Sequence, residues 1–303
     1  MGCATKTIKE NAVMTLPSPE IKAAATSNSA DMDFDDKIYD EDEKYEPLAK
    51  YYAKEKKINY AGYEIQKSFE KRGGKISVEV NKGGENILLL EYEGMNSYWV
   101  RWGLFPFLGG KIKQLVIKEY SGGAHCCTSY KIYTLESEPQ LIFDGNEYDM
   151  EEIGYSMKPV DINQDGVYEF TQAVMAFDYF HASHAASVFP TAIFSYDRHR
   201  KKYVLANHRF SAFLLRGIKE DERKARKAIQ LFERKKIIFN DSEYFYPMME
   251  VVLKYIYAGQ LQKGWSFFEE NYQEQDKDEL RKDLQNALKN DPTYKSIYDT
   301  SIK

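Results

Sequence analysis

The chain has 303 residues, of which 43% are hydrophobic and 29% are charged, and its net charge is −5 at pH 7. A chain of this length can bury a sizeable core and usually forms one or two domains. No stretch approaches the ~18 apolar residues that a membrane-spanning helix needs, so no segment is predicted to cross a bilayer.

The charge is distributed unevenly along the chain. Residues 31–46 contain nine acidic residues against two lysines, whereas residues 198–236 contain fourteen Lys and Arg against four acidic residues. Blocks of this kind are typical of solvated surfaces or tails. The basic block also contains aromatic residues, as surfaces that bind nucleic acid do. For an exported protein we expect instead an anionic envelope polymer or a protein as the partner, and not nucleic acid.

Residues 1–42 are predicted to form a disordered tether. The segment 15–30 is rich in Ser, Pro and Ala, the acidic block follows it, and neither shows hydrophobic periodicity. A segment of this composition cannot offset its ordering entropy by burial. Such a segment suits a domain held away from a membrane, and it equally suits an ordinary flexible terminus.

Residues 43–210 are predicted to form a β-rich domain. A short helix is expected over 43–57, where Leu48, Tyr51 and Tyr52 lie on one side. From Ile76 onward, apolar and polar residues alternate, which is typical of half-buried strands. Strands are expected at residues 76–80, 87–92, 98–102, 112–120, 130–135 and 140–143.

An internal repeat is predicted within this domain. Residues 113–143 and 168–205 share one order of elements, namely strand, loop containing His, strand, turn and strand. Their spacing is near the size of a propeller blade, which is about 40–50 residues. Two or three such units cannot close a propeller, and a generic β-meander is the alternative to a repeat.

After about residue 211 the hydrophobic period becomes helical. Apolar residues at i, i+3, i+4 and i+7 spacing run over 225–232 and again over 249–256, and further helices are expected at 261–272 and 276–290. The predicted fold is therefore α+β: a tether, an antiparallel β-core with propeller-blade-like units, and a C-terminal helical region over 211–303 packed on that core.

The segment 161–169 contains the strongest motif, Asp-Ile-Asn-Gln-Asp-Gly-Val-Tyr-Glu. A hard cation such as calcium takes six to eight oxygen ligands, and side chains at alternate positions of a tight loop converge on one point. Gly166 permits the sharp turn. The expected ligands are Asp161, Asn163, Asp165, the carbonyl of Val167, and Glu169.

This loop is not an EF-hand, because Gln172 stands where an EF-hand has its closing acid. It resembles the loops of FG-GAP and VCBS repeats, in which the acid at position 9 opens the next strand. The resemblance implies bound calcium between two strands of a β-rich core. An Asx-rich turn without metal is the alternative.

A second candidate site lies in the segment 121–127, Ser-Gly-Gly-Ala-His-Cys-Cys. Together with the Asp-rich loop, this segment resembles a group of exported bacterial lipoproteins, and that resemblance implies no particular activity. Cys126 and Cys127 could form a vicinal disulfide, or they could bind zinc with His125, with His181 and His184 as further ligands. The alternatives are a Gly-rich turn with small buried Cys side chains and, less favoured, a Cys–His nucleophile.

Cys3 is a candidate lipidation site. The run Gly2-Cys3-Ala4-Thr5-Lys6 resembles the cleavage end of a bacterial lipoprotein signal, where the Cys becomes the lipidated first residue. No apolar segment precedes it here. Myristoylation of Gly2 is less favoured because Lys6 stands where Ser or Thr is preferred, and an unmodified Cys is the remaining alternative.

These features favour a module without catalytic activity. It would be an exported lipoprotein of the bacterial cell envelope, periplasmic or at the outer membrane, that binds a partner or has a structural role through a calcium-stabilised β-domain. The sequence contains no complete catalytic constellation. Two alternatives stay open: a cell-envelope hydrolase with a His/Cys metal or thiol centre, and an intracellular scaffold that binds partners through its C-terminal helices.

Overall fold

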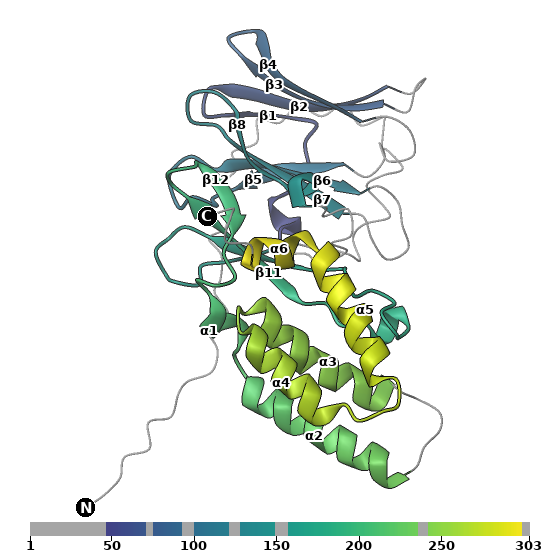
Figure 1. The fold of residues 1–303 in the computed structure, drawn as a ribbon. Helices are drawn as coiled ribbons and strands as arrows, with labels where there is room; N and C mark the ends of the chain where they lie inside the picture. The colour runs from purple at the N-terminus through teal and green to yellow at the C-terminus, as the bar shows by residue number, and fades with distance from the viewer. Residues whose placement is uncertain are drawn as a thin grey trace, which may run out of the picture.

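The computed structural model describes most of the chain beyond the predicted tether. In the part of the chain that it describes, three four-stranded antiparallel sheets come first and the α-helices follow, so the α+β class is confirmed (Figure 1). Cys3, His125, Cys126 and Cys127 lie outside the described residues, and so does the tether. The described residues are 47–70, 75–92, 100–120, 128–148, 157–235 and 242–298.

In each sheet the strands follow one another in sequence order. This meander arrangement needs only short turns between antiparallel neighbours. None of the three sheets within the described residues is closed on itself. The first sheet contains β1 (Lys57–Tyr60), β2 (Tyr63–Glu70), β3 (Lys75–Lys82) and β4 (Glu85–Tyr92).

The predicted helix over 43–57 is wrong in its described part, 47–57, where a single 3₁₀ turn, η2 (Ala49–Tyr51), takes its place. Its apolar side chains are buried, as expected, but against the second sheet: Tyr52 forms a β-bridge with Gly103. A Cβ on Gly103 would lie closer than 3.0 Å to the carbonyl oxygen of Tyr51, so this approach requires glycine.

The second sheet is the central layer of the protein. Alternate residues of one strand, β6, enter different cores: Leu115 and Ile117 join the core shared with the first sheet, and Val116 joins the core on the other face. Because both faces are covered, the strand is apolar at successive positions. The sheet contains β5 (Arg101–Phe105), β6 (Gln114–Tyr120), β7 (Thr128–Thr134) and β8 (Gln140–Asp144).

The third sheet packs on the second through aromatic side chains. Phe143 contacts Phe170 edge-on with ring centroids 4.7 Å apart, and Phe170 stacks on Phe194 at 5.0 Å. Such pairs are worth about 0.5–1.5 kcal/mol beyond their buried area. The sheet contains β9 (Lys158–Val160), β10 (Glu169–Ala173), β11 (Thr191–Asp197) and β12 (Lys202–Leu205).

The helices cover the third sheet on the side away from the second (Figure 1). One helix, α3, packs between two others, α2 and α4, and its residues Met248, Val252 and Ile256 are fully buried. Within the described residues, no helix combines the length and apolar character that crossing a bilayer requires. The helices are α1 (Ser211–Leu214), α2 (Ile218–Lys235), α3 (Ser242–Tyr257), α4 (Leu261–Asn271), α5 (Lys277–Asn290) and α6 (Pro292–Tyr298).

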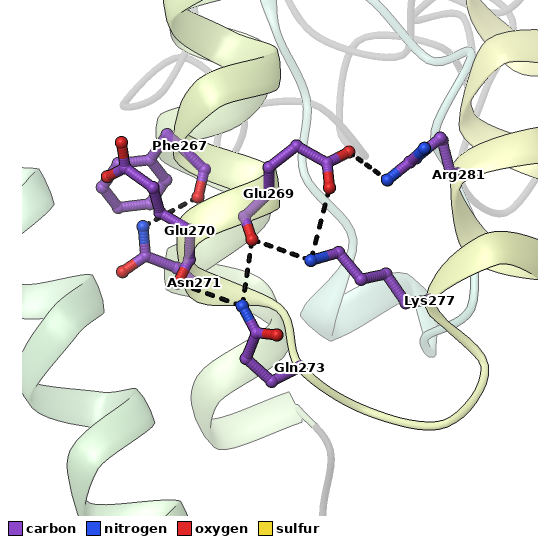
Figure 2. Close-up of polar contacts among 7 residues, drawn as sticks. All are labelled: Phe267, Glu269, Glu270, Asn271, Gln273, Lys277 and Arg281. Atoms are coloured by element: carbon purple, nitrogen blue, oxygen red, sulfur yellow. Dashed lines mark hydrogen bonds and ion pairs between the residues drawn. The ribbon is translucent and has the colours of Figure 1, made fainter.

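The C-terminal end of α4 is held by polar side chains that follow it (Figure 2). The carbonyl of Glu269 accepts hydrogen bonds from Lys277 Nζ at 2.7 Å and from the side-chain amide of Gln273 at 3.0 Å. The carboxylate of Glu269 pairs with Lys277 at 3.3 Å and also with Arg281. Cations at a helix C-terminus bond its last carbonyls and interact favourably with the helix dipole, so these contacts stabilise the end of α4 and connect it to α5.

Candidate functional site

The loop 161–168 connects β9 to β10, which are neighbouring antiparallel strands of the third sheet. Glu169 is the first residue of β10 and stands opposite Val160, the last residue of β9. The loop therefore closes a hairpin, and its two ends are fixed by the strand pairing.

The carboxylate of Asp161 organises the backbone of this loop. Its Oδ1 accepts a hydrogen bond from the N–H of Asp165 at 3.1 Å, and its Oδ2 accepts one from the N–H of Gly166 at 3.0 Å. Gln164 and Gly166 have φ values of 60° and 83°. The left-handed turns and the backbone donors together curl the chain around the Asp161 side chain.

Asn163 and Asp165 complete the exposed part of the loop. Asp165 Oδ1 accepts from the N–H of Val167 at 2.8 Å, and its Oδ2 accepts from the side-chain amide of Asn163 at 3.0 Å. Asn163 Oδ1 accepts from the N–H of Asp165 at 3.2 Å. The side chains at positions 1, 3 and 5 of the motif therefore contact one another or the loop backbone, as their alternate spacing implies.

Glu169 differs from these residues because its side chain is only 1% exposed. Its Oε2 accepts from the N–H of Ile162 at 3.0 Å, and its Oε1 accepts from the hydroxyl of Ser195 at 3.2 Å. Burial raises the pKa of Glu169 above its ordinary value of 4.5, and the two hydrogen bonds offset part of that rise. Ionisation of Glu169 in the folded protein therefore lowers the free energy of unfolding as the pH rises above 4.5.

The donor set of the loop fits a hard cation. Asp161, Asn163, Asp165, the carbonyl of Val167 and Glu169 offer only oxygens, which is the ligand type that calcium takes. Among the described residues, no group of three or more His, Cys, Asp or Glu side chains is gathered closely enough to hold a metal ion.

The loop is docked on the second sheet. The N–H of Tyr168 donates to the carbonyl of Phe107 at 2.7 Å. Gly109, in the connection between β5 and β6, has a φ of 66°, and a Cβ there would lie closer than 3.0 Å to the carbonyl oxygen of Gly166. No sequence pattern links these two segments, so this support was not predicted.

A cleft of about 1010 Å³ lies beside the loop. One wall is the loop with Asp165 and Glu169, another is the turn between β11 and β12, and α6 forms the third with Lys295. Arg198 and Arg209 also line it. Both arginines belong to the basic block 198–236, but no sequence pattern predicted the cleft.

The two histidines of the second candidate site have separate carboxylate partners. His181 Nε2 lies 3.0 Å from Asp283 Oδ2 on α5, whereas His184 Nδ1 lies 2.8 Å from Asp178 Oδ1 in its own loop. His181 and Tyr179 both have positive φ, at 49° and 56°, which is uncommon for residues other than glycine. The predicted partners His125, Cys126 and Cys127 lie outside the described residues.

No protein-family model matches the chain, and neither a curated protein nor a solved structure matches it.

Proposed function

We propose that the protein is an exported, membrane-anchored binding or structural module whose β-domain is stabilised by calcium at the loop 161–169. The observation that supports this proposal best is the loop itself. Asp161 folds the backbone around its carboxylate, and Asn163, Asp165, Val167 and Glu169 add only oxygens. Oxygen-only donors on a tight turn suit calcium better than a softer metal.

Calcium would act on stability mainly through Glu169. Its carboxylate is buried in the folded protein, and desolvation disfavours its charged form. A divalent cation next to Asp161, Asp165 and Glu169 would offset both this desolvation and the repulsion among the three carboxylates. Since the unfolded chain has no such loop, the ion would favour the folded state.

We expect calcium to raise the melting temperature of the purified protein. At 100 times the Kd the gain is about 2.7 kcal/mol, or roughly 5–10 °C for a protein of this size. Asp161→Ala should abolish the increment, because it removes a ligand and also the two hydrogen bonds that Asp161 accepts from the loop backbone. Asp278→Ala, an exposed acid in the first turn of α5, is the matched control and should retain it.

Melting curves that coincide in calcium and in chelator would show that the loop is a metal-free turn. Elemental analysis of the same preparation provides an independent measurement. The proposal requires calcium, whereas stoichiometric zinc would favour the hydrolase described below.

The anchor is proposed at Cys3, with the membrane as a partner and the cell envelope as the location. Its support is the sequence around Cys3 alone. Expressed in a bacterium from its native gene, the protein should sediment with membranes and remain there in high salt, and Cys3→Ser should release it. Release of the unaltered protein by salt would instead indicate electrostatic attachment through the basic block 198–236.

The propeller-blade-like character of the β-core also remains a proposal. It is supported by the meander order of all three sheets. A strand-by-strand superposition of β5–β8 on β9–β12 tests it, and the proposal fails if the two sheets differ in twist or strand offset.

A cell-envelope hydrolase is the second candidate function. The observation that favours it is the pair formed by His184 and Asp178, since a carboxylate at Nδ1 orients an imidazole for proton transfer or for metal binding through Nε2. The positive φ of Tyr179 and His181 places backbone strain in the same loop, as is common at active sites.

A further inference from the structure

The cleft beside the loop has a polar floor that results from strand alternation. Phe170 on β10 and Phe194 on β11 are register partners and both enter the aromatic core. Their neighbours Glu169 and Ser195 therefore point to the opposite face of the third sheet. Both line the cleft, and both side chains are buried, with exposures of 1% and 4%.

A chain of hydrogen bonds connects this floor to the rim. Arg209 Nη1 donates to Ser195 Oγ at 3.3 Å, and the Ser195 hydroxyl donates to Glu169 Oε1 at 3.2 Å. One contact to a neutral hydroxyl uses little of the donor capacity of a guanidinium, which has five N–H groups. Ser195 therefore holds Arg209 at the edge of the floor, and the guanidinium also lies 5.1 Å from the centre of the Phe210 ring.

The acidic residues that line the cleft are largely engaged elsewhere. Glu147 pairs with Lys202 at 3.2 Å. Asp197 accepts from the backbone N–H groups of its own turn and lies 3.7 Å from the guanidinium of Arg200. Asp165 accepts hydrogen bonds within the loop.

Three cations that line the cleft form no ion pair with a carboxylate of the described residues. Within the described residues, no carboxylate lies at ion-pair distance from Arg198, Arg209 or Lys295, although Lys295 Nζ donates to the carbonyl of Asn290 at 3.4 Å. The three come from the β11–β12 turn, from the segment after β12 and from α6, so only the tertiary fold brings them to one cleft. Cationic groups that converge on a concave site raise the local concentration of anions.

We propose that this cleft binds an organic anion, whose phosphate or carboxylate group is held by Arg209 together with Arg198 and Lys295. Guanidinium groups bind both oxyanions through paired hydrogen bonds, and the volume of the cleft is that of a small-molecule site. The body of the ligand lies against Val204, which is half-buried, lines the cleft and is the register partner of Ser195. This inference names a ligand class for the proposed binding module and rests on that function.

The test is a calorimetric titration of the full chain, in calcium-free buffer, with pyrophosphate in one arm and citrate in the other. Saturable binding is expected in at least one arm, with a Kd below about 1 mM. The double variant Arg198→Gln/Lys295→Gln should weaken it at least ~10-fold, and Arg209→Gln should do so as well. The matched control is Lys219→Gln/Lys227→Gln, two exposed lysines on α2, and it should bind within about 2-fold of the unaltered chain.

The two arms identify the oxyanion, since tighter pyrophosphate binding indicates a phosphate ligand and tighter citrate binding a carboxylate ligand. Arg198 and Lys295 are both exposed, so the double variant is expected to fold, and its melting curve verifies this. Absence of saturable binding in both arms overturns the proposal, and so does equal weakening by the cleft variant and the α2 control. Calcium-dependent melting in a protein that binds neither anion would leave the calcium loop in place and remove only the cleft.

Discussion

Replacing Gly109 by alanine is expected to lower the free energy of unfolding by about 2–4 kcal/mol, because two costs fall on one residue. Its φ of 66° strains any side chain, and its Cβ would collide with the backbone oxygen of Gly166. Backbone atoms cannot yield as the end of a flexible side chain can. The substitution should therefore displace the loop 161–169 from the second sheet, and the calcium-dependent increment in melting temperature should fall with it.

The adjacent glycine provides the matched control for this experiment. A Cβ on Gly110 meets no atom within 4 Å, and its φ is not in the positive region. Gly110→Ala should change stability by no more than about 0.5 kcal/mol and leave the response to calcium intact. Chemical denaturation with and without calcium measures both effects, and equal stabilities for the two variants would contradict the docking of the loop on Gly109.

Asp291→Ala is expected to cost about 2–4 kcal/mol, from a lost helix cap and an orphaned hydroxyl. Asp291 is 5% exposed and precedes α6, where its carboxylate accepts from the N–H of Tyr294 at 2.7 Å and of Thr293 at 3.3 Å. It also accepts from the hydroxyl of Tyr257 at 2.5 Å. Because Tyr257 is 1% exposed, water cannot replace the lost partner.

A companion variant, Tyr257→Phe, distinguishes the cap from the hydroxyl contact. Tyr257→Phe removes the hydroxyl and leaves the cap, so it should cost less than Asp291→Ala. Burial raises the pKa of Asp291 above its ordinary value of 3.8, so its charged form costs more stability as the pH rises through the folded-state pKa. Denaturant titrations give the differences, with Asp278→Ala as the control. An Asp291→Ala variant as stable as that control would contradict the buried cap.

Local patterns predicted the elements that bury one strong apolar face. Period-two alternation located β3, and helical spacing located α3 and α5. The pattern failed where burial is weak or the element is short: β1 alternates between exposed and half-buried positions, β9 has three residues, and α6 has seven.

The candidate site likewise has one part that the sequence predicted and one part that it did not. The ligand oxygens of the loop 161–169 were predictable because nine consecutive residues supply them. The cleft was not predictable, since Glu169, Ser195, Arg209 and Lys295 come from four separate segments. Their proximity depends on the pairing of β10 with β11 and on the packing of α6 against β12, and no spacing along the chain encodes either contact.

The central position of the second sheet has a consequence for strand register. A strand with one polar face cannot slip by one residue, because the slip would expose its apolar side chains. Leu115, Val116 and Ile117 are apolar on both faces of β6, so polarity alone does not prevent this slip. Gly103 on β5 pairs with Val116, and its missing side chain makes room for the carbonyl of Tyr51. A shift of β5 would place Trp102 or Leu104 under that carbonyl, so the absence of one side chain fixes the alignment on which both cores are built.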